Sequence, residues 1–107
     1  LPSGPRMAEL GVDAVLYPLQ SVLVAPHGQP SQPERNGVLS NGTGFPAVTF
    51  PAGYSTPTKD APLGVPVGAE LLGLDYSEPR LLGYAYAFEQ AAKVRRSPAS
   101  TPALAKK

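Results

Sequence analysis

The order of apolar and polar residues predicts three short strands. Compact apolar runs lie at residues 14–17, 47–50 and 65–74, each bounded by proline or glycine, as strands commonly are. The run at 14–17 does not alternate apolar with polar residues, which predicts a strand buried on both faces. Because one helix cannot cover both faces of a sheet, we expect further helices to come from residues outside this chain.

A helix is predicted to follow the third strand. Ser77 suits the N-cap position, Glu78 suits the positive end of the helix dipole, and Pro79 fits the first turn. Pro98 ends the pattern, and residues 98–107 are predicted to be an irregular tail. Apolar residues recur at steps of three and four and form one face that should pack in the core: Leu81, Leu82, Tyr84, Ala85, Phe88 and Ala92.

The remaining segments are predicted to be mostly irregular. Residues 1–6 are turn-rich, and residues 7–10 suit the last turn of a helix that ends at Gly11. Prolines and glycines disfavour regular structure over residues 26–38, and loops of this length usually bind something, cover a site or move. The segment 55–64 is predicted to be an exposed loop or hairpin turn.

Two prolines enclose the second strand. Pro46 and Pro51 fix φ and cannot donate a hydrogen bond to a neighbouring strand. They are therefore predicted to delimit a short inner strand at residues 47–50, after which Gly53 lets the chain turn away.

A polar, glycine-containing segment, Ser40–Gly44, precedes that strand and has the sequence SNGTG. Its backbone N–H groups could cradle an anion, but the Lys-Ser/Thr ending of a phosphate-binding P-loop is missing. The alternative is a loop shaped by the conformational freedom of Asn and Gly.

Composition removes several classes of function. The 107 residues suffice for one small domain at most, and a hydrophobic fraction of 42% is typical of a globular chain. A net charge of +1, with basic residues clustered only near the tail, argues against a nucleic-acid partner. No apolar run is long enough for a membrane span. The chain has no cysteine, and its single histidine, His27, lacks neighbouring ligands, so we expect no metal and no cofactor.

Four stretches resemble the C-terminal part of the amidase signature hydrolases. They are VDAVLYP from Val12, TGFPAVTFPAGYS from Thr43, APLGVPVGAELLG from Ala61, and SEPRLLGYAYAFEQAAKVRRSPASTP from Ser77. No single motif establishes the resemblance, which rests on the order and spacing of the four stretches. It covers residues 11–102. The positions in register with the family pattern are Asp13, Pro18, Gly44, Pro46, Ala47, Pro51, Gly53, Pro66, Val67, Gly68, Gly73 and Glu89.

The resemblance implies a fold and an activity. Residues 1–107 would be the C-terminal segment of an α/β enzyme, an α/β/α sandwich with a mixed central sheet, to which this chain gives about three strands and one well-formed helix. The family hydrolyses the C–N bond of carboxylic amides with a Ser–cis-Ser–Lys triad. Those catalytic residues have no match here and would lie outside this chain. The expected partners are the remaining N-terminal part of the same amidase and a small amide substrate.

The resemblance also implies a contact with the substrate. In this family the loop entering the G-x-P-A strand lies near the substrate cavity, which implies that Ser40, Asn41, Gly42, Thr43 and Gly44 form part of the pocket wall. Two alternatives stay open beside the small-amide hydrolase. The chain could be a segment of the A subunit of a tRNA-dependent amidotransferase, or a non-catalytic fragment that acts as a structural or interaction module. The cytoplasm is slightly favoured as the compartment.

Overall fold

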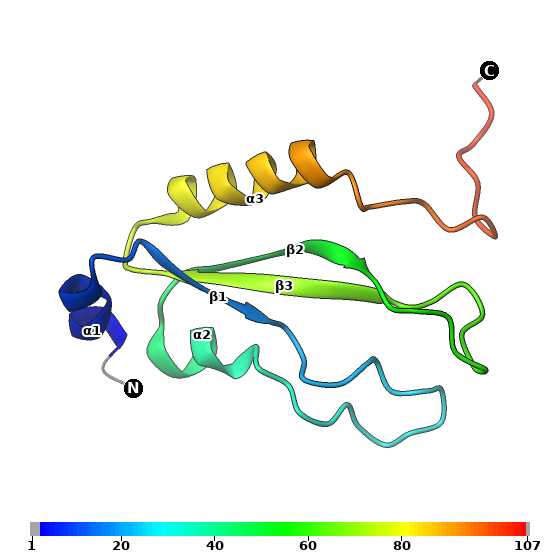
Figure 1. The fold of residues 1–107 in the computed structure, drawn as a ribbon, viewed down its shortest axis with the longest axis horizontal. Coiled ribbons are helices and arrows are strands. Elements are labelled where there is room, and N and C mark those ends of the chain that lie inside the picture. The colour runs from blue at the N-terminus through cyan, green and yellow to red at the C-terminus, as the bar shows by residue number, and fades with distance from the viewer. Residues whose placement is uncertain (1–2, 107) are drawn as a thin grey trace.

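A three-stranded antiparallel sheet forms the centre of the computed structural model, which describes residues 3–106 (Figure 1). The strands are β1 (Ala14–Pro18), β2 (Ala47–Tyr54) and β3 (Pro66–Gly73), and they lie in the order β1-β3-β2. The central strand β3 is antiparallel to both neighbours. The prediction of an α/β chain with three strands at these positions is confirmed.

The strand β2 continues beyond Pro51, although the sequence predicts that it ends there. Pro51 lies opposite Gly68, and the register shifts between Pro51 and Gly53, as in a β-bulge. Among the described residues β2 is an edge strand, so the N–H that Pro51 lacks is not needed for pairing with β3. The prediction of a short inner strand that stops at Phe50 is therefore wrong.

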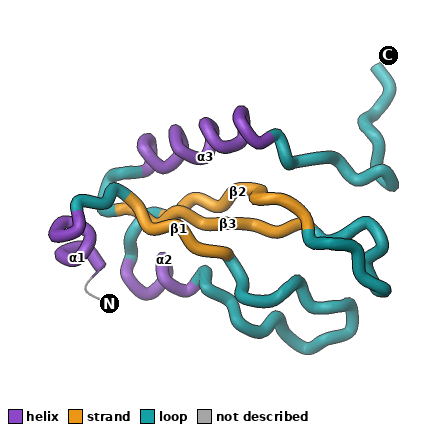
Figure 2. The backbone as a smooth tube through the Cα atoms, in the orientation of Figure 1, coloured by secondary structure: helices purple, strands orange, loops and turns teal. Residues whose placement is uncertain are grey.

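Three helices accompany the sheet: α1 (Ser3–Leu10), α2 (Val38–Thr43) and α3 (Glu78–Ala92). Figure 2 shows α3 running along one side of the sheet, α2 on the other side, and α1 beside one end. Helix α1 ends at Gly11, which has a left-handed φ of 65°, as predicted. The prediction that the chain is merely turn-rich up to residue 6 is wrong from Ser3 onward, and residues 1–2 lie outside the described part.

The ends of α3 differ in detail from the prediction. Ser77 occupies the N-cap position, but its hydroxyl donates to the carbonyl of Leu74 (2.6 Å) and does not cap the helix. The helix ends at Ala92 because Lys93 adopts a left-handed conformation with φ 49°. It thus stops before Pro98, and residues 93–106 form no helix or strand.

The core is small and lies where α3 meets the sheet and where α1 meets the sheet end. Its buried apolar residues are Met7, Leu72 and Leu81. The rings of Phe50 and Phe88 pack with centroids 5.1 Å apart and an interplanar angle of 56°. The expectation that Phe88 and Tyr84 lie in the core is only partly met, because these side chains remain 36% and 41% exposed.

The first strand is more exposed than its sequence predicts. Val15 and Leu16 alternate in direction along β1, and they are 37% and 64% exposed. The prediction that this strand is buried on both faces is therefore wrong within residues 3–106. The helix α3 packs mainly over β2 and β3 and leaves the Val15 and Leu16 side chains largely uncovered.

Two polar contacts attach α3 to the start of β1. The Arg80 guanidinium donates to Asp13 Oδ1 (3.0 Å), and the Tyr84 hydroxyl donates to Asp13 Oδ2 (3.3 Å). All three groups are on the surface, where such pairs contribute about 1 kcal/mol or less. They orient β1 relative to the helix more than they stabilise the fold.

Candidate functional site

The segment Ser40–Gly44 is mostly helical, which corrects the prediction of a loop. Residues 38–43 form α2, and Gly44 closes it with φ 74°, its N–H donating to the Ser40 carbonyl (2.8 Å). The Ser40 hydroxyl donates to the carbonyl of Phe45 (2.8 Å), and the Thr43 hydroxyl donates to the carbonyl of Leu39 (2.7 Å). The helix forms because its side chains and its left-handed cap satisfy the last turn.

This geometry limits what the segment can bind. The Gly44 N–H is used inside the helix, and the carboxyl end of a helix carries partial negative charge, so the segment is a poor cradle for an anion. The hydroxyls of Ser40 and Thr43 serve the local backbone. Asn41 and Gly42 are exposed and are the two positions that remain open to an external contact.

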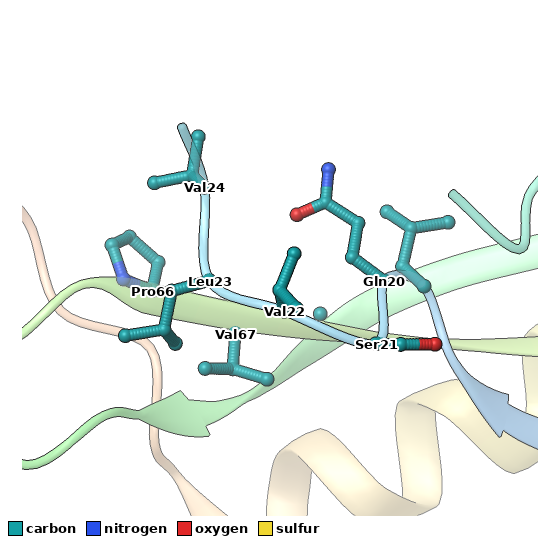
Figure 3. A pocket seen from close by; sticks show the side chains of 9 residues that line it. Gln20, Ser21, Val22, Leu23, Val24, Pro66 and Val67 are labelled. Atoms are coloured by element: carbon teal, nitrogen blue, oxygen red, sulfur yellow. The ribbon is translucent and has the colours of Figure 1, made fainter. Parts of the chain in front are cut away.

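A separate groove of about 650 Å³ lies beside β3. Figure 3 shows Pro66 and Val67 next to the extended stretch that carries Val22, Leu23 and Val24. These three apolar side chains are 42%, 43% and 54% exposed. Gln20 and Ser21 add polar groups to the lining of the groove. None of the residues 40–44 lines this groove.

The most buried charged residue of the described chain is Glu70, at the centre of β3. Glu70 is 4% exposed, and its Oε1 accepts a hydrogen bond from the Tyr17 hydroxyl (2.5 Å). Tyr17 lies directly opposite Glu70 on β1, so both side chains project from the same face of the sheet. Burial, the hydrogen bond to Glu70 and the charge of Glu70 raise the pKa of Tyr17 well above its usual range. The tyrosine therefore remains a neutral donor under ordinary conditions.

Sequence reasoning did not identify this pair. The available signal was a glutamate inside the apolar run VPVGAELLG, because an acidic residue in a central strand needs a hydrogen-bonding partner. The partner could not be found in that way, since Tyr17 is 53 residues away and is brought opposite Glu70 by the strand register.

Other candidate chemistry is scarce in residues 3–106. His27 is exposed in the loop before α2. The described residues contain no cluster of three or more His, Asp or Glu side chains able to hold a metal ion. Each helix in this part of the chain is too short or too polar to cross a bilayer.

Comparison with known proteins identifies amide-processing relatives. Over 63 residues, 59% of this chain, the sequence is 43% identical to a probable amidase of Arabidopsis thaliana. Over 54 residues, 50% of this chain, it is 43% identical to the A subunit of glutamyl-tRNA(Gln) amidotransferase from Synechococcus sp. strain CC9605. It is also 37% identical over 62 residues, 58% of this chain, to a fatty acid amide hydrolase of Arabidopsis thaliana.

The matches cover only 11%, 10% and 9% of the lengths of these three relatives. No protein-family profile and no solved structure matches the chain. The relatives form a class of proteins that act on amide groups. All are members of the amidase signature family, and over about half its length this chain is homologous to them. The family resemblance predicted from the sequence is confirmed.

Proposed function

We propose that this chain is a segment of an amidase-signature enzyme that hydrolyses the C–N bond of carboxylic amides. The observation that carries the proposal is the 37–43% identity to the amidase, amidotransferase and amide hydrolase relatives. The triad that the resemblance implies would be supplied by polypeptide outside these residues, because no matching Ser-Ser segment and catalytic lysine occur in this sequence.

The same proposal includes the larger architecture. In an α/β/α sandwich with a mixed central sheet, both faces of the sheet are covered by helices. The exposed apolar side chains Leu16, Val22 and Leu82 support this arrangement, since they lie on the strand, the loop and the outer face of α3. The remaining N-terminal part of the enzyme would cover them.

The activity is tested with the full-length gene product. Purified protein is incubated with small aliphatic and aromatic carboxamides, and the released ammonia is measured. We expect ammonia release that is linear with enzyme concentration and abolished by a serine-directed phosphonofluoridate. Absence of hydrolysis across the carboxamide series would refute the proposed activity.

The A subunit of an amidotransferase is the second candidate, because several relatives carry that name. It predicts little hydrolysis of simple carboxamides and transfer of an amide group to glutamyl-tRNA(Gln) when the other subunits are added. The two assays run on one preparation separate these functions. A protein that is inactive in both assays would favour the structural or interaction role.

We further propose that Ser40–Gly44 contributes to the wall of the substrate pocket. Asn41 supports this, since its carboxamide is exposed and makes no hydrogen bond within the described residues.

Asn41→Ala should raise KM several-fold with kcat nearly unchanged, because a binding contact made equally in the ground state and the transition state is lost. Gln90→Ala, which removes an exposed carboxamide from α3, is the matched control and should leave KM unchanged. Equal KM values for the two variants would contradict the assignment of Ser40–Gly44 to the pocket wall.

A further inference from the structure

The chain contains two Asn-Gly pairs, and both lie shortly before β2. They are Asn36-Gly37, which precedes α2, and Asn41-Gly42, which lies inside α2. Such a pair is chemically labile because glycine has no Cβ, so its backbone nitrogen can approach the carboxamide of the preceding asparagine. The two pairs share this local chemistry, and the structure around each pair distinguishes them.

Asn36 is held by contacts with the end of β1. Its side-chain amide donates to the Pro18 carbonyl (2.9 Å), and its backbone N–H donates to the Leu19 carbonyl (2.9 Å). The carboxamide and the backbone of Asn36 are thus both engaged. Turning the carboxamide onto the Gly37 nitrogen therefore costs hydrogen bonds to a different element of the fold.

Asn41 is held only by the short helix in which it lies. Its side chain is exposed, and its carboxamide makes no hydrogen bond within residues 3–106. Helix α2 has six residues and none of them is buried, and a helix of this length is marginal without packing. Local opening of its last turn frees the Gly42 nitrogen. The space around Gly42 is open, because a Cβ there would have no neighbour within 4 Å.

We propose that Asn41 is a site of deamidation, and that the fold directs this modification to Asn41 and away from Asn36. The backbone nitrogen of Gly42 loses its proton and attacks Cγ of Asn41. The new C–N bond closes a cyclic succinimide, the Cγ–Nδ2 bond breaks, and ammonia leaves with the proton. Water then opens the ring at either carbonyl and gives aspartate or isoaspartate. Water is the only co-reactant, and asparagine is among the thermolabile residues for this reason.

Both products change the last turn of α2. Aspartate places a negative charge near the carboxyl end of the helix, where the helix dipole disfavours it. Isoaspartate adds a methylene group to the main chain between residues 41 and 42. The hydrogen bond from the Gly44 N–H to the Ser40 carbonyl (2.8 Å) spans this position. The modification should therefore loosen the turn that leads into β2.

Peptide analysis of the unmodified full-length gene product tests the selectivity. The protein is kept folded in mildly alkaline buffer, samples are digested with trypsin, and tandem mass spectrometry locates aspartate and isoaspartate. Trypsin cleaves after Arg35 and Lys59, so one peptide, residues 36–59, contains both pairs. Because two hydrogen bonds of ordinary strength hold Asn36, Asn41 should convert at least about tenfold faster.

The same protein unfolded in denaturant is the control. Neither pair then has structure around it, so both asparagines should convert at similar rates. In the folded protein, equal conversion of the two asparagines, or faster conversion of Asn36, overturns the proposal. The absence of conversion at Asn41 over the period in which the unfolded control converts also overturns it.

A glycine variant gives a second measurement. In Gly42→Ala the added methyl group hinders attack by the backbone nitrogen and meets no neighbour within 4 Å. It should slow conversion of Asn41 at least about tenfold without lowering Tm. Gly83→Ala, which also adds a methyl group in open space within a helix, is the matched control and should leave the conversion unchanged. Undiminished conversion in Gly42→Ala would contradict the succinimide route.

This inference goes beyond the proposed function and does not depend on it. Mass analysis needs no substrate, so modification of Asn41 without amide hydrolysis refutes the function alone. Amide hydrolysis without modification of Asn41 refutes the deamidation site alone.

Discussion

Glu70 is a buried acidic residue in the middle strand of the sheet. An ionised carboxylate in a strand interior loses its hydration, and the hydrogen bond from Tyr17 replaces part of it. Gly37, just before α2, lies near the other oxygen, since a Cβ at that position would be in ordinary van der Waals contact with Glu70 Oε2 at 3.8 Å. The polar pair thus links β1 to β3 at the centre of the sheet.

Removing the donor should destabilise the protein measurably. Tyr17→Phe leaves a buried carboxylate oxygen without its hydrogen bond, and we expect the free energy of unfolding to fall by about 1–3 kcal/mol. Denaturant titration of the full-length product at neutral pH measures the change. Tyr76→Phe is the control, because Tyr76 is 92% exposed and its hydroxyl is already hydrated. Equal stability of the two variants would mean that the Tyr17 hydrogen bond contributes nothing.

The same pair predicts a dependence of stability on alkaline pH. The pKa of Tyr17 is raised in the folded state, mainly by burial and then by Glu70, so the folded protein keeps a proton that the unfolded chain loses above about pH 10. Below that pH the contribution of Tyr17 to the free energy of unfolding should not change with pH. Above it, the free energy of unfolding should fall as the pH rises. In Tyr17→Phe this component of the alkaline fall should vanish, whereas Tyr76→Phe should retain it.

At the scale of elements, close approach at Gly73 determines how α3 packs on β3. A Cβ at Gly73 would lie 3.1 Å from both methyl groups of Leu81 and would collide with the Ser77 hydroxyl oxygen. Leu81 is fully buried, so it has little room to move away. The glycine therefore lets the first turn of α3 lie directly on the end of the strand.

Two glycine substitutions should have opposite effects. Gly73→Ala should lower the free energy of unfolding by about 1–3 kcal/mol, because the added methyl group overpacks the contact with Leu81. Gly83→Ala should raise it by about 0.5–1 kcal/mol, since Gly83 lies inside α3 and a Cβ there has no neighbour within 4 Å. Thermal unfolding of both variants checks this, and a stabilised Gly73→Ala would show that α3 does not approach β3 as described.

The elements differ in how well the sequence predicts them. Compact apolar runs are sufficient to predict the positions of the three strands. Apolar residues spaced three and four positions apart are sufficient to predict α3. Helix α2 could not be predicted, because Asn and Gly in its sequence disfavour a helix and its stability comes from the Gly44 turn and two local hydroxyl contacts. The Glu70–Tyr17 pair depends on register between distant strands, which local patterns do not specify.

At the scale of the whole molecule, the main feature is the small amount of buried apolar surface. Only Met7, Leu72 and Leu81 are buried apolar residues in the described chain, whereas many large apolar side chains are exposed. A chain of this size normally stabilises itself by burying more than half of its unfolded surface. Coverage by the remainder of the proposed enzyme would account for this exposed apolar surface.

Residues 1–107 expressed alone should behave as a weakly ordered chain. We expect strong fluorescence of 1-anilinonaphthalene-8-sulfonate in its presence and a broad thermal transition, because the apolar surface at Leu16, Val24 and Leu82 is open. The full-length product should bind much less dye per molecule and unfold sharply. A sharp, cooperative transition in the isolated chain would show that it is an autonomous domain.

The strand order β1-β3-β2 also has a consequence for the time course of folding. Tyr54 pairs with Pro66 across a short hairpin, whereas Ala14 pairs with Gly73 across most of the chain, and closing the longer loop has the larger entropic cost. The hairpin and α3 should thus assemble first. During synthesis β1 emerges before β3 exists, so the side of β1 that pairs with β3 remains open until late. In this period the chain is most exposed to aggregation or to capture by a chaperone.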